Sequence, residues 1–209
     1  MTVEAPPLDE SFGAPAAGDQ LTRAAKALGE RNYAAHVVDT PADASELLFE
    51  LLPRDKEIFT AAGETLRLSG IAEHIDASGE FRSVRQRLTE FEGDVETQIK
   101  LGAAPDVVVG SVHAVTEDGI MVAASASGSQ LASYAAGARK AYWIVGAQKV
   151  VPDLETALRR VRTYSLPREY DRIMKASGFQ SFIGKLLILE REAFPDRGTV
   201  ILVREAIGF

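Results

Sequence analysis

The run PDVVVGSVHAV, residues 105–115, constrains the fold most, because it is the most apolar β-branched stretch of the chain. Such a run is typical of a central strand that is buried on both faces of a sheet. Asp118-Gly119 then offers a tight turn, and IMVAAS, residues 120–125, predicts a second strand beside the first. A strand buried on both faces needs helices on both sides of its sheet, so the rest of the chain has to supply them.

Helical and strand-like segments do alternate along most of the chain. Apolar residues at helical spacing run from Leu21 to Leu28, Ala44 to Leu51, Leu68 to Ile75, Leu131 to Ala138 and Leu154 to Val161. Strand-like runs lie between them at residues 34–39, 56–62 and 141–147. This alternation predicts a parallel-rich sheet that is covered by helices on both faces.

Three local expectations follow from the same patterns. Asp43 is predicted to begin the second helix, and one continuous helix is predicted across residues 68–75. The last two apolar runs, 185–190 and 199–203, predict a hairpin about the turn Pro195-Asp196-Arg197-Gly198. The charged residues 80–104 are expected to be helical where they are exposed.

The length of 209 residues, with 46% hydrophobic and 25% charged residues, fits a single α/β domain over residues 19–209. Residues 1–18 are rich in proline, alanine and glycine, which predicts a disordered tail. This start has neither the basic residues nor the apolar core of a signal peptide, and no run is apolar enough to cross a membrane. A cytoplasmic protein without membrane insertion is therefore expected.

Charge and cysteine content exclude several classes of function. The net charge of −7 argues against a nucleic-acid partner, because proteins that bind the phosphate backbone usually carry an excess of basic residues. The chain has no cysteine, so it has no thiolate nucleophile and cannot hold an iron–sulfur cluster by itself. The three histidines are far apart in sequence and form no metal-binding pair, so no metal site is expected.

Among the histidines, His113 is the candidate for a ligand site, whereas His36 and His74 lie in apolar periodic segments and are expected to be structural. His113 falls at the end of the strongest strand run. In open α/β sheets, ligands usually bind beyond the carboxyl ends of the strands. Lys149 follows another strand and precedes a helix, so it either pairs with an anionic ligand or is simply a solvated lysine.

Two further candidates lie in the segment between residues 112 and 137. Ser127, Gly128 and Ser129 precede a predicted helix, where free backbone N–H groups either bind an anion or are merely capped by a serine. Glu117 stands on the predicted turn, where it either projects toward a ligand or is solvated. The segment has neither the spacing of a phosphate-binding Walker loop nor that of a dinucleotide fingerprint.

With these residues laid out, Pro105 to Val161 resembles the core of the LUD domain family, to which lactate utilization protein C belongs. The resemblance rests on four motifs in order, namely AVTEDGIMV, ASASGSQLA, YWIVG and GAQKVVPDLETA, with AGETLRLSGI before them and TVILVREAIGF after them. It covers most of residues 20–209. The family's asparagine-lysine pair reads Gln148-Lys149 here, and SGFQSFIGKLLILE lacks the cysteines that several members carry.

The resemblance implies a three-layer α/β/α sandwich similar to the NagB/RpiA/CoA transferase-like fold. It also implies a non-redox part in the bacterial oxidation of L-lactate to pyruvate, beside iron–sulfur partner subunits. A small anionic metabolite is the expected ligand at His113, Ser127, Gly128, Ser129 and Lys149, and a homo-oligomer is compatible with this role.

Two alternatives stay open. TEDGI is similar to the glutamate-containing turn of CoA transferases, which implies a CoA-transferase-like or ligase-like enzyme with CoA as ligand and Glu117 as the catalytic nucleophile. A purely structural or regulatory subunit is the other.

Overall fold

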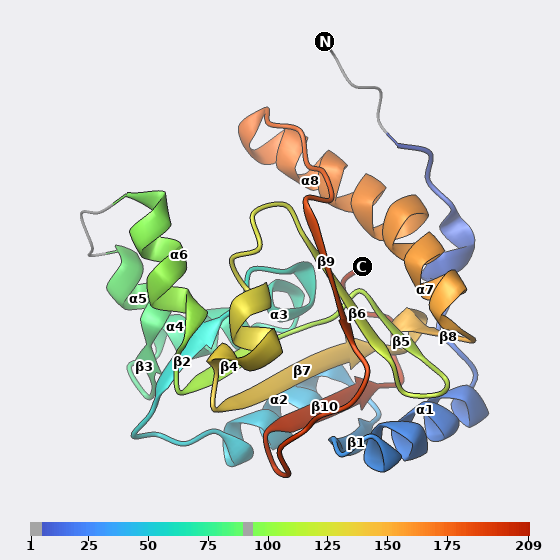
Figure 1. The fold of residues 1–209 in the computed structure, drawn as a ribbon, viewed down its shortest axis with the longest axis horizontal. Coiled ribbons are helices and arrows are strands. Elements are labelled where there is room, and N and C mark those ends of the chain that lie inside the picture. Colours follow the sequence, from blue (N-terminus) through green and yellow to red (C-terminus); the bar gives the residue numbers. More distant parts are fainter. Residues whose placement is uncertain (1–5, 90–93) are drawn as a thin grey trace.

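The computed structural model describes residues 6–89 and 94–209, and a six-stranded parallel sheet forms its centre (Figure 1). The strands lie in the order β1 (Ala34–Val38), β10 (Gly198–Val203), β7 (Lys140–Gly146), β4 (Val107–Gly110), β2 (Glu57–Thr60) and β3 (Arg82–Ser83). Every pairing in the described part of this sheet is parallel. The predicted α/β fold with a parallel-rich sheet is confirmed.

A four-stranded sheet packs beside this central sheet. Its strands lie in the order β8 (Val150–Val151), β5 (Ala114–Thr116), β6 (Met121–Ser125) and β9 (Lys185–Leu189). The predicted turn at Asp118-Gly119 joins β5 to β6, which pair antiparallel. Gly119 adopts φ +87°, and a Cβ there would lie 2.8 Å from the backbone of Ala27, so the turn requires glycine.

Helices cover both sheets. They are α1 (Gly18–Glu30), α2 (Pro41–Leu51), α3 (Glu64–Leu68), α4 (Ile71–Ala77), α5 (Val84–Thr89), α6 (Val95–Ala103), α7 (Leu154–Arg160) and α8 (Leu166–Ser177). Short 3₁₀ turns occur at Glu10–Gly13 and Ala147–Lys149, and π-helical turns at Ser133–Gly137 and Val161–Ser165. The last of these joins α7 to α8.

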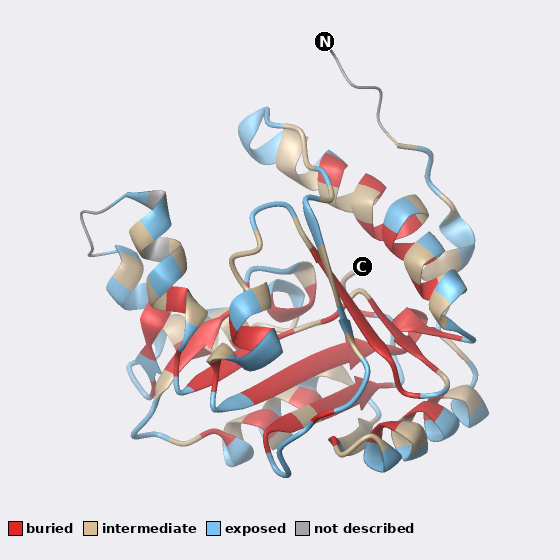
Figure 2. Cartoon of the chain, in the orientation of Figure 1, coloured by how far each residue is buried: buried red, intermediate tan, exposed pale blue. Residues whose placement is uncertain are grey.

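Side-chain alternation along the strands builds two cores, one on each face of the large sheet. Val107 and Val109 of β4 pack with α2, α3 and α4, whereas Val108 packs with α1 on the opposite face. The second core also takes in inward-facing residues of the small sheet, such as Val115 and Met121. Figure 2 shows the inner strands β10, β7, β4 and β2 of the large sheet almost wholly buried between these layers. This burial explains their near-continuous β-branched composition.

A third core lies on the other face of the small sheet. Ala114 and Val122 from this sheet pack against Ala157 of α7 and Val161 just after it. The small sheet is therefore enclosed between the large sheet and the α7–α8 arm, which consists of α7, α8 and the π-helical turn Val161–Ser165 between them.

The run 105–115 was predicted to form one strand, but the structure divides it between two strands in different sheets. Its first half is β4 and its last residues begin β5. The break follows Gly110, where the backbone N–H of Ser111 donates to the hydroxyl of Tyr134 and the Ser111 hydroxyl donates to the Ile144 carbonyl. These bonds divert the chain from the ladder and leave residues 111–113 as a connector between the sheets.

The predicted helix across 68–75 is interrupted. Gly70 adopts φ +73°, which ends α3 and starts α4, and Leu68 is 55% exposed instead of being in the core. The predicted start of the second helix is three residues late. Thr40 is the N-cap, and Asp43 occupies N3, where its carboxylate accepts from the Thr40 backbone N–H.

The predicted C-terminal hairpin is wrong, because the two strands belong to different sheets. β9 pairs antiparallel with β6, and β10 inserts between β1 and β7. Arg197, in the turn between them, is buried and pairs with the carboxylate of Glu192 at 2.6 Å. Its guanidinium also donates to the carbonyls of Ser133, Tyr134 and Ala138, which fastens the crossover to the body of the protein.

Part of the predicted disordered tail is ordered. Residues 1–5 lie outside the described residues, but Glu10–Gly13 form a 3₁₀ turn that Asp9 caps. Phe12 packs on the third core, and the guanidinium of Arg159 stands 5.5 Å from its ring centroid. Across the described ranges, no helix has the length and apolar content that a membrane span requires.

Candidate functional site

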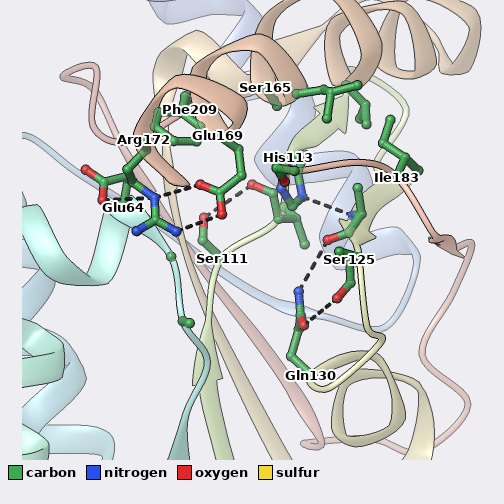
Figure 3. A pocket seen from close by; sticks show the side chains of 18 of the residues that line it. Glu64, Ser111, His113, Ser125, Gln130, Ser165, Glu169, Arg172, Ile183 and Phe209 are labelled. Carbon is green, nitrogen blue, oxygen red and sulfur yellow. Dashed lines mark hydrogen bonds and ion pairs between the residues drawn. The ribbon is translucent and has the colours of Figure 1, made fainter. Parts of the chain in front are cut away.

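A cavity of about 300 Å³ opens where the strands of the large sheet end. Its walls include the segments that follow β2 (residues 62–65), β4 (residues 111–113) and β7 (Lys149), together with Phe209 beyond β10. Residues of the β6 loop and of the α7–α8 arm close the remaining sides (Figure 3). This is the edge at which α/β sheets usually bind ligands.

Lys149 is the most unusual side chain of this cavity, because it is 1% exposed and carries an amine. Its Nζ donates to Thr65 Oγ1 at 2.8 Å and to Ser111 Oγ at 3.0 Å. None of the carboxylates in the described part of the chain pairs with it. Burial, and then the charge of Arg160, hold the pKa of Lys149 well below its ordinary value. The alternative of a solvated lysine is thereby excluded.

Arg160 is a second buried cation behind the same wall, at the end of α7. Its guanidinium donates to the carbonyls of Gln148 and His113 and to the hydroxyl of Ser165, while Nη2 has no hydrogen-bond partner. Burial lowers the pKa of Arg160 to about 10, so the group stays charged at neutral pH. It therefore gives this wall of the cavity a positive charge with which no carboxylate of residues 6–89 and 94–209 forms an ion pair.

His113 lies on the cavity wall in a defined tautomer. Its Nδ1 accepts the backbone N–H of Ala124 at 3.1 Å, which places the ring proton on Nε2. No described residue bonds Nε2. Burial, followed by the charges of Lys149 and Arg160, lowers the pKa of His113 to about 3. The ring is therefore neutral and offers one N–H donor.

This pKa predicts a specific acid sensitivity. In the unfolded chain the histidine binds a proton near pH 6.5, but in the folded protein only near pH 3, so the unfolded state binds more protons between these values. The free energy of unfolding should therefore fall as the pH drops from 6.5 toward 3, by roughly 2–4 kcal/mol from this group. Urea denaturation at several pH values would measure the fall.

The matched variants are His113→Gln, which should flatten this part of the pH profile, and His36→Gln, which should not. His36 lies in β1, away from the cavity lining. Parallel profiles for wild type and His113→Gln would contradict the assignment.

The loop after β6 contributes Ser127, Ser129 and Gln130 to the cavity, with Gly128 between them. Two of its backbone donors are used within the loop, because Gly128 N–H donates to Ser125 Oγ at 2.9 Å and Ser129 N–H to Ser127 Oγ at 3.3 Å. Gly128 adopts φ +88°, which allows this turn. Serine hydroxyls thus accept N–H groups within the loop, and Ser127 and Ser129 line the cavity.

Two carboxylates stand on the wall opposite this loop. Glu169 pairs with Arg172 through two hydrogen bonds of 2.7 Å, and Arg172 also lies 3.7 Å from Glu64 (Figure 3). Glu64 accepts from Arg67 at 2.8 and 2.9 Å, and this pairing lowers the pKa of Glu64. Both acids are matched by arginines, so they do not provide the missing counter-ion of Lys149.

Gln148 holds the end of the chain at the cavity. Its side-chain amide donates to the carbonyls of Ile207 and Gly208 at 2.9 and 2.8 Å. Phe209 is thereby placed on the cavity wall. The glutamine therefore has a structural task next to Lys149.

Glu117 is not part of this cavity. Its carboxylate accepts from Arg23 Nε at 2.6 Å and from Gln20 Nε2 at 2.8 Å, both on α1. These bonds lower the pKa of Glu117 and attach the β5–β6 turn to α1. A turn carboxylate held in this way is a poor nucleophile for an acyl group in the cavity.

The substitution Glu117→Gln should accordingly have little effect on the stability of the protein or on its reaction with acyl-CoA. The ion pair with the half-exposed Arg23 is screened by solvent, so the free energy of unfolding should stay nearly unchanged. Incubation with acyl-CoA should add no mass to either the wild type or the variant. An acyl adduct on the wild type that disappears in Glu117→Gln would instead establish Glu117 as the nucleophile.

Four of the residues predicted from the sequence line the same cavity, namely His113, Ser127, Ser129 and Lys149. The residues that bond to them were not predicted. Ser111 directly follows β4, so the rule that ligands bind at strand ends could have found it. Thr65 and Arg160 gave no such signal, since both lie within helices and neither directly follows a strand.

Comparisons with known proteins agree with this architecture. The family model described as "LUD domain" matches residues 21–203. The chain is also similar to a solved structure, that of a DUF162 family protein from Deinococcus radiodurans, with a TM-score of 0.56 and 12% identity over 94% of this chain and 99% of that one. At this identity the likeness shows the fold alone. No curated protein matches the sequence. Because the family model spans nearly all of the ordered fold, the chain belongs to the LUD domain family.

Proposed function

We propose that this protein binds a small anionic metabolite in the cavity around Lys149, as a non-redox component of bacterial L-lactate utilization. The observation that carries the binding proposal is the buried amine of Lys149, which pairs with no carboxylate among the residues that the structure describes. The charged form of such an amine is costly to bury without a counter-ion, and an anion that enters the cavity stabilises that form.

The charges around the cavity favour an anion over a neutral or cationic ligand. Arg160 adds a second unmatched positive charge, and His113 is neutral and can only donate through Nε2. Glu64 and Glu169 are matched by arginines. The volume of about 300 Å³ is at the lower limit for ligand pockets, which suits a small metabolite.

The part in lactate oxidation is supported by family membership and by the composition of the chain. The absence of cysteine means that electron transfer through iron–sulfur clusters has to take place on partner subunits. In this arrangement the LUD chain would hold the organic acid, and the partners would carry the electrons.

A thermal-shift panel tests the binding proposal. L-lactate, pyruvate, acyl-CoA esters, nucleotides and sugar phosphates are compared with chloride at equal ionic strength. A ligand at 100 times its Kd adds about 2.7 kcal/mol, which raises the Tm of a chain of this size by roughly 5–10 °C. Small carboxylates should give such a shift, and a panel without any shift would overturn the proposal.

The pathway is tested separately in the native host. Deletion of the coding sequence should abolish growth on L-lactate, and the tagged protein should copurify with proteins that carry iron–sulfur clusters. Normal growth together with no such partner would remove the pathway from the proposal while leaving the binding site intact.

A further inference from the structure

The hydrogen bonds of Lys149 show which groups accept the N–H bonds of its amine. The Ser111 hydroxyl donates its proton to the Ile144 carbonyl at 2.6 Å, so its oxygen is free to accept from Lys149. The Thr65 hydroxyl is 3.4 Å from the Ile207 carbonyl and is likewise an acceptor for the amine. Both partners therefore take an N–H from the lysine.

An uncharged amine has two N–H bonds and one lone pair, whereas an ammonium has three N–H bonds. Two hydroxyl acceptors satisfy the uncharged amine fully and leave its lone pair toward the cavity that Lys149 lines. A third N–H would find no acceptor among the described residues. A lysine that is desolvated and lies near another cation is the typical setting of an amine nucleophile.

His113 adds a donor on the same wall. With Nδ1 engaged by Ala124, its Nε2–H is the one polar ring atom left for a ligand. A neutral imidazole N–H polarises a carbonyl oxygen without giving up its proton. The amine and the imidazole thus form a pair suited to a carbonyl group, one for its carbon and the other for its oxygen.

The same wall favours a carbonyl compound that also carries negative charge. Lys149 and Arg160 repel each other when both are charged, and an anionic group in the cavity beside Lys149 offsets this repulsion. A small molecule with a carbonyl next to a carboxylate, a 2-oxo acid, meets both requirements within about 300 Å³.

We propose that Lys149 condenses with the carbonyl carbon of a small 2-oxo acid to form an imine, an inference that rests on the proposed binding function of this cavity. The nitrogen lone pair forms the new bond to carbon, and the carbonyl oxygen leaves as water with the two amine protons. A carbon–nitrogen double bond replaces the carbon–oxygen double bond, so no oxidant or reductant takes part. His113 donates a hydrogen bond to the departing oxygen.

Reductive trapping tests the imine on the full chain. The protein is incubated with pyruvate and sodium borohydride, and its intact mass is compared with that after borohydride alone. Hydride reduction makes the imine a stable secondary amine, so the adduct survives digestion. Peptide mapping of the wild type should place the adduct on Lys149, which requires no variant to fold.

Variants define the roles. Lys149→Met should abolish the adduct, and Lys140→Arg, which alters an exposed lysine at the start of β7, should leave it unchanged. Ser111→Ala removes one acceptor of the amine and should slow trapping about tenfold, which corresponds to one hydrogen bond.

The outcomes separate this inference from the proposed function. A thermal shift with pyruvate but no adduct on Lys149 overturns the imine and leaves anion binding in place. Neither shift nor adduct with pyruvate, 2-oxobutyrate or glyoxylate overturns the imine, and a panel without any thermal shift overturns anion binding as well. An adduct spread over exposed lysines, and equal in Lys149→Met, also overturns the imine.

Discussion

Replacing Gly110 with alanine is expected to lower the free energy of unfolding by about 3 kcal/mol. Gly110 ends β4 directly before the connector that carries Ser111 and His113. A Cβ at this position would overlap the hydroxyl oxygen of Tyr134 and lie 2.6 Å from its Cζ. The Tyr134 ring has no room to retreat, because it is 1% exposed and packs edge-on against Trp143 with 5.7 Å between ring centroids.

The same substitution should disturb the cavity. The Tyr134 hydroxyl accepts from the Ser111 N–H and donates to the Ser111 carbonyl, both at 3.1 Å, and Ser111 in turn holds the amine of Lys149. Urea denaturation measures the loss of stability, and the ligand-induced thermal shift measures the loss of the site. Both should decrease together.

The control is Gly29→Ala in α1, where a Cβ would meet nothing within 4 Å. Alanine in a helix is more favourable than glycine, so this variant should be neutral or up to about 1 kcal/mol more stable. In the Gly110→Ala background, Tyr134→Phe removes the nearest atom and should restore part of the stability. Equal stability of Gly110→Ala and wild type would contradict the packing argument.

The layer arrangement was predictable from the sequence, because its signal is local. Alternating strand and helix patterns require a covered parallel sheet, and Leu21, Ala24 and Leu28 do face the core as their spacing predicts. The sheet assignments were not predictable in the same way. Periodicity reports burial but not which strand pairs with which. Residues 105–115 were therefore predicted as one strand, and the last two strands as one hairpin, although in both cases the two parts belong to different sheets.

The candidate site shows the same division. His113 and Lys149 could be proposed because they follow apolar strands, and position relative to a strand end is visible in a sequence. Their environment was not visible. That Lys149 is buried depends on Thr65, 84 residues away, and on Ser111, 38 residues away, and such long-range contacts leave no local pattern. Glu117 was a candidate because of its position on the β5–β6 turn, but Arg23 and Gln20 of α1 bind its carboxylate outside the cavity.

Lys149→Met is expected to abolish the ligand-induced thermal shift while leaving the unliganded protein as stable as wild type or more stable. Methionine has a similar length but no charge to desolvate, and the two hydroxyls that lose the amine keep their carbonyl acceptors. Loss of the amine that lines the cavity should weaken anion binding at least about 100-fold, equivalent to about 2.7 kcal/mol. Thermal denaturation with and without the ligand found in the panel measures both effects.

The pH dependence provides an independent check on this variant. The pKa of Lys149 in the folded protein lies well below 10.5, so between the two values the unfolded state binds the extra proton. The wild type should therefore gain stability as the pH rises toward 10.5, and Lys149→Met should lack this gain, whereas Lys140→Arg should keep it. If Lys149→Met were instead strongly destabilised at every pH, the lysine would be a structural residue whose hydrogen bonds hold Thr65 and Ser111 together. A stable variant without ligand binding would mean that the buried amine is retained for the ligand at a cost to the fold.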